Sequence, residues 1–103
     1  MRLHALCASI TADLRRTWTL DELAREAGLS RRSLNAKFRD TFNMTVSEFI
    51  RCKRLEFARD ALVHQSMSVA EAAYSVGYDN PANFATAFRR HFGHSPSVCR
   101  KPQ

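Results

Sequence analysis

Four side chains in the segment 31–42 have the types and spacing that suit contact with a DNA groove, three of them for base edges and Arg39 for a phosphate. These are Arg32, Asn35, Ala36 and Arg39. In a helix of about 3.6 residues per turn they share one face, opposite Leu34 and Phe38. Arginine can pair with guanine O6 and N7, asparagine can pair with adenine N6 and N7, and a small alanine permits close approach. The pattern indicates a surface that reads a DNA groove, although a plain solvated helix face can carry the same residues.

An internal repeat places this face in a larger pattern. Residues 19–30 align with 68–79, and after one inserted residue 34–42 align with 84–92. Both copies contain Ala-x-x-x-Gly, ending at Gly28 and Gly77, followed by an apolar residue, a capping residue and a second amphipathic segment. Alanine lets two helices approach closely, and glycine tolerates the positive φ of a tight corner. The sequence therefore predicts two helix-turn-helix motifs.

Helix start signals and apolar spacing together predict an all-α fold of seven helices. Capping boxes of the form Ser/Thr-x-x-Glu begin at Thr19, Thr45 and Ser68, and Asn80-Pro81 marks a fourth start. The predicted helices lie near 3–16, 19–27, 31–42, 46–63, 69–76, 81–92 and, as a short one, from about 96.

The long helix 46–63 lies between the two motifs and is expected to join them. One apolar stripe follows Phe49, Cys52, Leu55, Ala58 and Leu62, and a second follows Ile50, Phe57 and Ala61. At about 1.5 Å per residue such a helix spans roughly 27 Å, somewhat less than the ~34 Å of one DNA turn. We therefore expect one DNA-binding unit over 1–103, with a first subdomain at 1–44, a linker helix at 45–63 and a second subdomain at 64–103.

Composition and residue spacing limit the classes of function that the chain can have. The formal charge is +6 at pH 7, which favours a polyanionic partner such as nucleic acid, an anionic membrane surface or an acidic protein. No apolar run approaches the roughly 20 residues of a membrane span and no export signal is recognisable, so we expect a cytoplasmic protein with no membrane partner. Cys7, Cys52 and Cys99 stand far apart, which predicts half-buried free thiols and no metal site. The sequence contains no catalytic triad, metal cluster or phosphate-binding glycine loop, so we expect neither an enzyme nor a cofactor.

The segment 77–96, Gly-Tyr-Asp-Asn-Pro-Ala-Asn-Phe-Ala-Thr-Ala-Phe-Arg-Arg-His-Phe-Gly-His-Ser-Pro, resembles the signature of AraC-type bacterial transcription regulators. Supporting matches are Leu23-Ala24, Gly28-Leu29-Ser30, Phe38, Phe49-Ile50-Arg51, Arg54-Leu55 and Ala58. The resemblance covers nearly the whole chain. It implies seven helices, two helix-turn-helix motifs that bind consecutive major grooves of double-stranded DNA, and contact with RNA polymerase, usually for activation.

The resemblance also implies which residues contact DNA. The family's base-reading positions correspond to Arg32, Asn35 and Ala36 in the first motif and to Ala82, Asn83 and Thr86 in the second. We further expect five residues to contact phosphates or to position the helices: Arg31, Arg39, Asn80, Arg89 and Arg90. In the repeat alignment the second face lacks the long donors of the first, so the second motif is expected to anchor the domain more than it specifies sequence.

Two features depart from the family. Ser95-Pro96-Ser97-Val98 is followed by Cys99 where the family usually has an aromatic residue, which predicts weaker packing of the last helix. The family's sensing and dimerisation domain is absent, so the chain is either a stand-alone regulator or, as we favour, a DNA-binding fragment of a longer protein. A helical module that docks on an acidic protein remains an alternative, because the same arginines would serve it.

Overall fold

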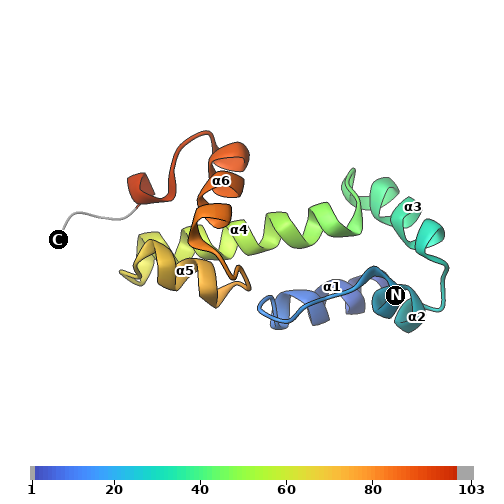
Figure 1. The fold of residues 1–103 in the computed structure, drawn as a ribbon. Helices are drawn as coiled ribbons and strands as arrows, with labels where there is room; N and C mark the ends of the chain where they lie inside the picture. The colour runs from blue at the N-terminus through green and yellow to red at the C-terminus, as the bar shows by residue number, and fades with distance from the viewer. Residues whose placement is uncertain (1, 100–103) are drawn as a thin grey trace. The chain divides into compact units, whose positions relative to one another are not determined.

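A computed structural model describes residues 2–99, and over this range the chain is helical with no strand (Figure 1). The elements in chain order are α1 (Arg2–Ala12), α2 (Leu20–Ala27), α3 (Arg31–Phe42), α4 (Val46–His64), α5 (Val69–Ser75), α6 (Pro81–Phe92) and the 3-10 helix η1 (Pro96–Cys99). The predicted all-α class is confirmed. The predicted seventh helix is the 3-10 helix, so the described residues form six α-helices.

The first helix is shorter than its apolar pattern indicates. It ends at Ala12, whereas the sequence predicted a helix that continues to residue 16. After Ala12 the chain forms a turn, in which the backbone N–H of Asp13 donates to the Ile10 carbonyl at 3.2 Å. The indole N–H of Trp18 donates to the Asp13 carbonyl at 2.8 Å. Leu14 in this turn is still buried, which explains why the apolar spacing continues past the helix end.

The chain divides into two compact units, Met1–Arg51 and Cys52–Gln103, with the boundary inside α4. Each unit has a cluster of buried side chains of its own. The first cluster contains Leu3, Leu6, Ile10, Leu14, Leu23, Ala24, Ala27, Leu34, Phe38, Val46, Phe49 and Ile50. The second contains Leu55, Ala58, Leu62, Ala72, Ala73, Val76, Phe84 and Phe88. The predicted assignment of α4 to a separate linker segment stays a prediction.

Aromatic side chains at i, i+4 spacing hold the second helix of each motif on its cluster. In the first unit the ring of Phe38 lies 5.4 Å from the rings of Phe42 and Phe49, centroid to centroid. In the second unit the ring of Phe88 lies 5.6 Å from that of Phe84 and 4.5 Å from that of Phe92. Since these stripes face the clusters, the opposite faces of α3 and α6 are left exposed.

Both predicted apolar stripes of α4 contain buried residues, but Phe57 in the second stripe is exposed. Leu55 is fully buried in the second cluster, whereas Phe57, two residues later, keeps 45% of its surface exposed. The apolar stripe through Ile50, Phe57 and Ala61 is therefore buried at its two ends and exposed at Phe57. A helix of 3.6 residues per turn places positions two apart about 200° from each other, so both cannot face the same cluster.

The predicted helix starts are present, and two of the three capping boxes are reciprocal. At Ser68 and at Thr45 the side-chain oxygen accepts from the N–H three residues on, and that residue's glutamate accepts from the capping backbone N–H. At Thr19 the hydroxyl accepts from the Glu22 N–H, but the Glu22 carboxylate accepts from the Thr19 hydroxyl and from Arg16 instead. None of the described helices is both long and apolar enough to cross a bilayer.

Candidate nucleic-acid interface

The two predicted corners have the same backbone hydrogen bonds. In the first, the N–H groups of Leu29 and Gly28 donate to the carbonyls of Ala24 and Arg25, at 2.9 and 3.1 Å. In the second, the N–H groups of Tyr78 and Gly77 donate to the carbonyls of Ala73 and Tyr74, at 3.0 and 3.2 Å. Each of these residues lies 49 positions after its counterpart in the first corner. These hydrogen bonds form a Schellman motif, which needs a left-handed residue after the helix. Gly28 has φ +71° and Gly77 has φ +97°, so both glycines serve the corners as predicted.

Helix α3 begins at Arg31 directly after the first corner. The Ser30 hydroxyl caps it by accepting from the Ser33 N–H at 3.0 Å. The predicted base-reading residues Arg32 and Ala36 are exposed. Arg31 is also exposed, and its Nε lies 3.4 Å from Oδ1 of Asp21 in α2, an ion pair that the sequence analysis did not anticipate.

Asn35 has a partner inside the protein. Its side-chain oxygen accepts from the backbone N–H of Val46, the first residue of α4, at 3.0 Å, and the residue is half-buried. The sequence offered no signal for this contact, because the two residues are 11 positions apart in different helices. Base reading by Asn35 stays a prediction.

Helix α6 begins after the second corner. Asn80 is its N-cap, since its side-chain oxygen accepts from the N–H groups of Ala82 and Asn83 at 2.8 and 3.3 Å. Ala82, Asn83 and Thr86 are exposed, and the Thr86 hydroxyl donates to the Ala82 carbonyl at 3.1 Å. This bond occupies the hydroxyl hydrogen, so the outward chemistry of Thr86 is an acceptor oxygen and a methyl group.

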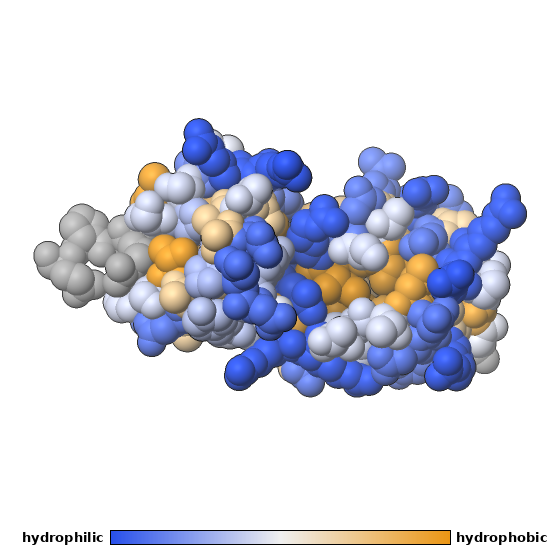
Figure 2. Space-filling model, in the orientation of Figure 1, coloured by the Kyte–Doolittle hydropathy of each residue, from blue (hydrophilic) through white to orange (hydrophobic). Residues whose placement is uncertain are grey.

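The predicted phosphate-contacting arginines all lie on exposed surface. They are Arg31 and Arg39 in α3 and Arg89 and Arg90 in α6. In Figure 2 hydrophilic side chains cover parts of α3 and α6, as they do much of this face. Each motif thus combines a buried aromatic stripe with an exposed face that carries arginine, and only the first has arginine near its start.

Two carboxylates beside the helix starts have lowered pKa values. The Thr19 hydroxyl, followed by the Arg16 guanidinium, holds the pKa of Glu22 below its usual value. At the start of α4 the backbone N–H of Thr45 has the largest effect in lowering the pKa of Glu48, and Arg39 acts in the same direction. Both groups are therefore charged at neutral pH, and Glu48 also caps α4 by accepting from the Thr45 N–H.

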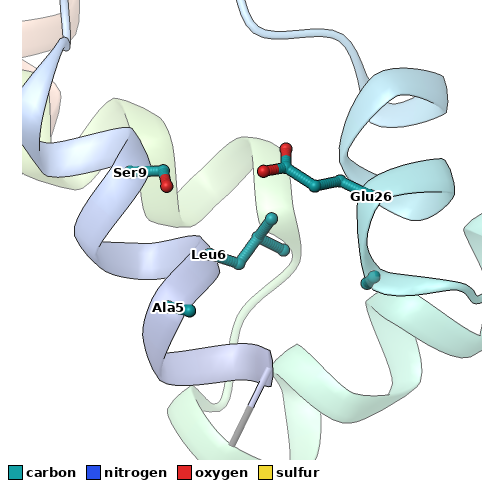
Figure 3. A pocket seen from close by; sticks show the side chains of 5 residues that line it. Ala5, Leu6, Ser9 and Glu26 are labelled. Atoms are coloured by element: carbon teal, nitrogen blue, oxygen red, sulfur yellow. The ribbon is translucent and has the colours of Figure 1, made fainter.

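A small hollow lies between α1 and α2. It is lined by Ala5, Leu6, Ser9, Glu26 and Ala27 and measures about 170 Å³ (Figure 3). The Glu26 side chain extends from α2 towards α1, and Leu6 points into the space (Figure 3). Small-molecule sites usually measure about 300–1,000 Å³, so this hollow is smaller than such sites.

The three cysteines are half-buried, as predicted. Sγ of Cys52 lies 4.0 Å from Nδ1 of His91, and Sγ of Cys99 lies 3.9 Å from Nδ1 of His94. Among residues 2–99 no three histidine, cysteine or acidic side chains gather as a metal site would require.

Comparison with known proteins places this geometry in a family. Residues 23–102 match the model of a helix-turn-helix domain. The chain is 34% identical over 82 residues to the Msm operon regulatory protein of Streptococcus mutans, covering 80% of this chain and 30% of that protein. It is 29% identical over 99 residues to the transcriptional activator RhaR of Klebsiella pneumoniae, covering 96% of this chain and 35% of that protein. The chain thus spans about a third of the length of these relatives.

Solved structures agree with the sequence matches. An AraC-type transcriptional regulator from Chromobacterium violaceum superposes with a TM-score of 0.88 at 25% identity, covering 96% of this chain and 88% of that one. The DNA-binding domain of AdpA, solved in complex with a target DNA, superposes with a TM-score of 0.87 at 27% identity, covering 93% and 86%. The chain therefore belongs to the AraC-type family of helix-turn-helix DNA-binding domains.

Proposed function

We propose that this chain binds specific double-stranded DNA and regulates transcription, inserting α3 and α6 into neighbouring segments of the major groove. The observation that carries the proposal is the repeated corner, in which the same Schellman motif delivers a helix with an exposed arginine-bearing face. An α-helix fits the major groove of B-DNA, and a helix that follows a tight corner is the usual reading element. The AdpA domain, which has the same fold, was solved on its target DNA.

The two motifs have different tasks in this proposal. In the first, exposed Arg32 reads a base edge and Ala36 allows close approach. In the second, Ala82, Asn83 and Thr86 face the bases and offer mainly methyl groups and short polar groups. The phosphate contacts come from exposed arginines at 31, 39, 89 and 90, with Asn80 fixing the start of α6.

Family membership supports further proposals for the location and the remaining partners. We propose that the chain acts without catalysis in the cytoplasm, where bacterial DNA lies, and that it contacts RNA polymerase as an activator. The relative RhaR is named as a transcriptional activator and supports this direction. Because the relatives are about three times as long, we also propose that a sensing or dimerisation domain accompanies this unit in the whole protein.

Selection of binding sites from random duplex DNA, combined with salt titration, tests the proposal. The parent chain should select one sequence over random DNA, and its affinity should fall steeply with salt. Arg32→Ala should relax preference at one base pair, at a cost of about 1–3 kcal/mol, whereas Arg89→Ala should weaken all sequences and flatten the salt slope by about one unit.

Arg25→Ala is the matched control, because Arg25 is an exposed arginine of α2 outside both predicted faces. It removes the same charge and should leave base preference unchanged. A parent chain that selects no sequence would contradict the proposed function and favour a module that docks on an acidic protein. Sharper preference in the half bound by α6 would contradict the proposed division of tasks.

A further inference from the structure

The hydrogen bond between Asn35 and Val46 joins the exposed helix α3 to the start of α4. The first N–H groups of any helix have no partner inside that helix. At the start of α4, the Thr45 hydroxyl accepts from the Glu48 N–H at 3.2 Å, which accounts for one of them. The Val46 N–H is accounted for by the Asn35 side-chain oxygen at 3.0 Å, so this cap comes from another helix.

The second repeat provides an internal comparison. At the repeat offset of 50 residues, Asn35 corresponds to Ala85 and Val46 corresponds to Pro96. Proline has no backbone N–H to donate, and alanine has no side-chain acceptor. The acceptor is therefore present in the copy that has a donor and absent in the copy that has none, a correlation that base reading by Asn35 does not explain.

Adenine recognition would also need both the oxygen and the NH₂ group of Asn35. A bidentate pair needs the side-chain oxygen to accept from adenine N6 and the NH₂ group to donate to N7. In this structure the oxygen already accepts from Val46, and the residue is half-buried beside the start of α4 while its neighbours Arg32 and Ala36 are exposed.

We propose that Asn35 is a positioning residue, whose amide oxygen fixes α3 against the first turn of α4 and thereby sets how Arg32 is presented to DNA. This inference rests on the proposed DNA-binding function. It assigns sequence discrimination in the first motif to Arg32 and Ala36, with Asn35 acting through the orientation of the helix.

A thermal double-mutant cycle tests the hydrogen bond itself. Asn35→Ala should lower Tm by about 4–8 °C, as expected for one lost hydrogen bond in a chain of this size. Val46→Pro copies the second repeat and removes the donor, and proline is favoured at the first position of a helix. In that background Asn35→Ala should lower Tm by less than half as much. An equal loss in both backgrounds would overturn the inference.

Base preference tests the positioning role with a variant that keeps the acceptor. Asn35→Asp retains an oxygen for the Val46 N–H but removes the NH₂ donor that adenine N7 requires. At a temperature where all variants are folded, Asn35→Ala should reduce the base preference at every base pair that α3 reads. Asn35→Asp should keep the parent's order of preference while its added charge weakens binding to all sequences.

A direct base-reading role gives the opposite pattern. Asn35→Ala would then lose preference at one base pair, and Asn35→Asp would shift that pair from adenine towards cytosine, whose N4 donates to a carboxylate. Either result overturns the inference, as does unchanged preference in Asn35→Ala. A parent chain that selects no sequence would instead overturn the proposed function and the positioning role with it, while the thermal cycle would still decide whether the Asn35–Val46 bond holds the two helices together.

Discussion

Replacing Leu55 by alanine should strongly destabilise the second unit. Leu55 is fully buried in the second cluster, and the substitution removes three carbon atoms from it. At about 0.8 kcal/mol for each buried CH₂ group the transfer cost is ~2.4 kcal/mol, and the cavity left behind raises the total to about 3 kcal/mol, within the usual range of roughly 2–5. At about 4–8 °C per kcal/mol, Tm should fall by roughly 12–24 °C.

Phe57→Ala on the same helix is the matched control. Phe57 is a larger apolar side chain, but 45% of its surface is already exposed, so its loss leaves no enclosed cavity and should cost less than the loss of Leu55. Urea and thermal unfolding followed by far-UV circular dichroism give both values. Equal costs for the two variants would refute the assignment of which face of α4 is buried.

The single tryptophan adds a local readout. Trp18 packs against the cluster of the first unit, so its fluorescence follows that cluster. In Leu55→Ala the circular-dichroism transition should move further than the Trp18 transition. Equal shifts of both probes would show that the two clusters unfold in one step.

Three further outcomes are expected. Gly93 ends α6 at φ +84°, and its counterpart in the first repeat, Asn43, ends α3 at φ +60°. Gly93→Ala should therefore lower the free energy of unfolding by about 1–2 kcal/mol in calorimetry, and Gly93→Asn by clearly less. Equal losses would exclude backbone strain as the cause. The pKa of Glu48 is lowered in the folded chain, so the stabilisation that its charge gives is present above its unfolded pKa of ~4.3 and is lost as pH falls through the folded pKa. Glu48→Gln should therefore flatten the decline of Tm between about pH 5 and 3. A decline as large as that of the parent chain would contradict this. Asp21→Ala should change Tm little, because the ion pair between Asp21 and Arg31 is exposed. It should tighten DNA binding, measured by fluorescence anisotropy, because Arg31 is then released from Asp21. Weaker binding would show that Asp21 orients Arg31 for DNA contact.

Local signals in the sequence were sufficient for most of the fold. Ser/Thr helix caps, Ala-x-x-x-Gly corners and aromatic spacing each depend on residues within one or two helical turns, and these elements formed where they were predicted. The end of α1 was not predictable in the same way. Leu14 continues the apolar spacing and is buried, but it is buried from a turn that the Trp18 indole helps to hold. Periodicity reports burial, and burial does not require a helix.

The exposed faces were only partly predictable. Projection around 3.6 residues per turn correctly identified Arg32 and Ala36 as exposed, because this depends on one helix alone. The partners of Arg31 and Asn35 lie in other helices, and one sequence without its fold does not show which helices come together. The same limit explains Phe57, whose exposure depends on what packs against α4.

The corners separate the scaffold of each motif from its outward face, which bears on protein engineering. Since the same hydrogen bonds close both corners, side chains on the outward face of α3 could be transplanted onto α6 to rewrite what the second motif recognises. Arginine at position 82 would be such a graft, because that position is exposed. Asparagine at position 85 would not transfer on its own, since Pro96 offers no N–H to receive it. A successful graft would therefore carry over the outward residues and leave position 85 as alanine.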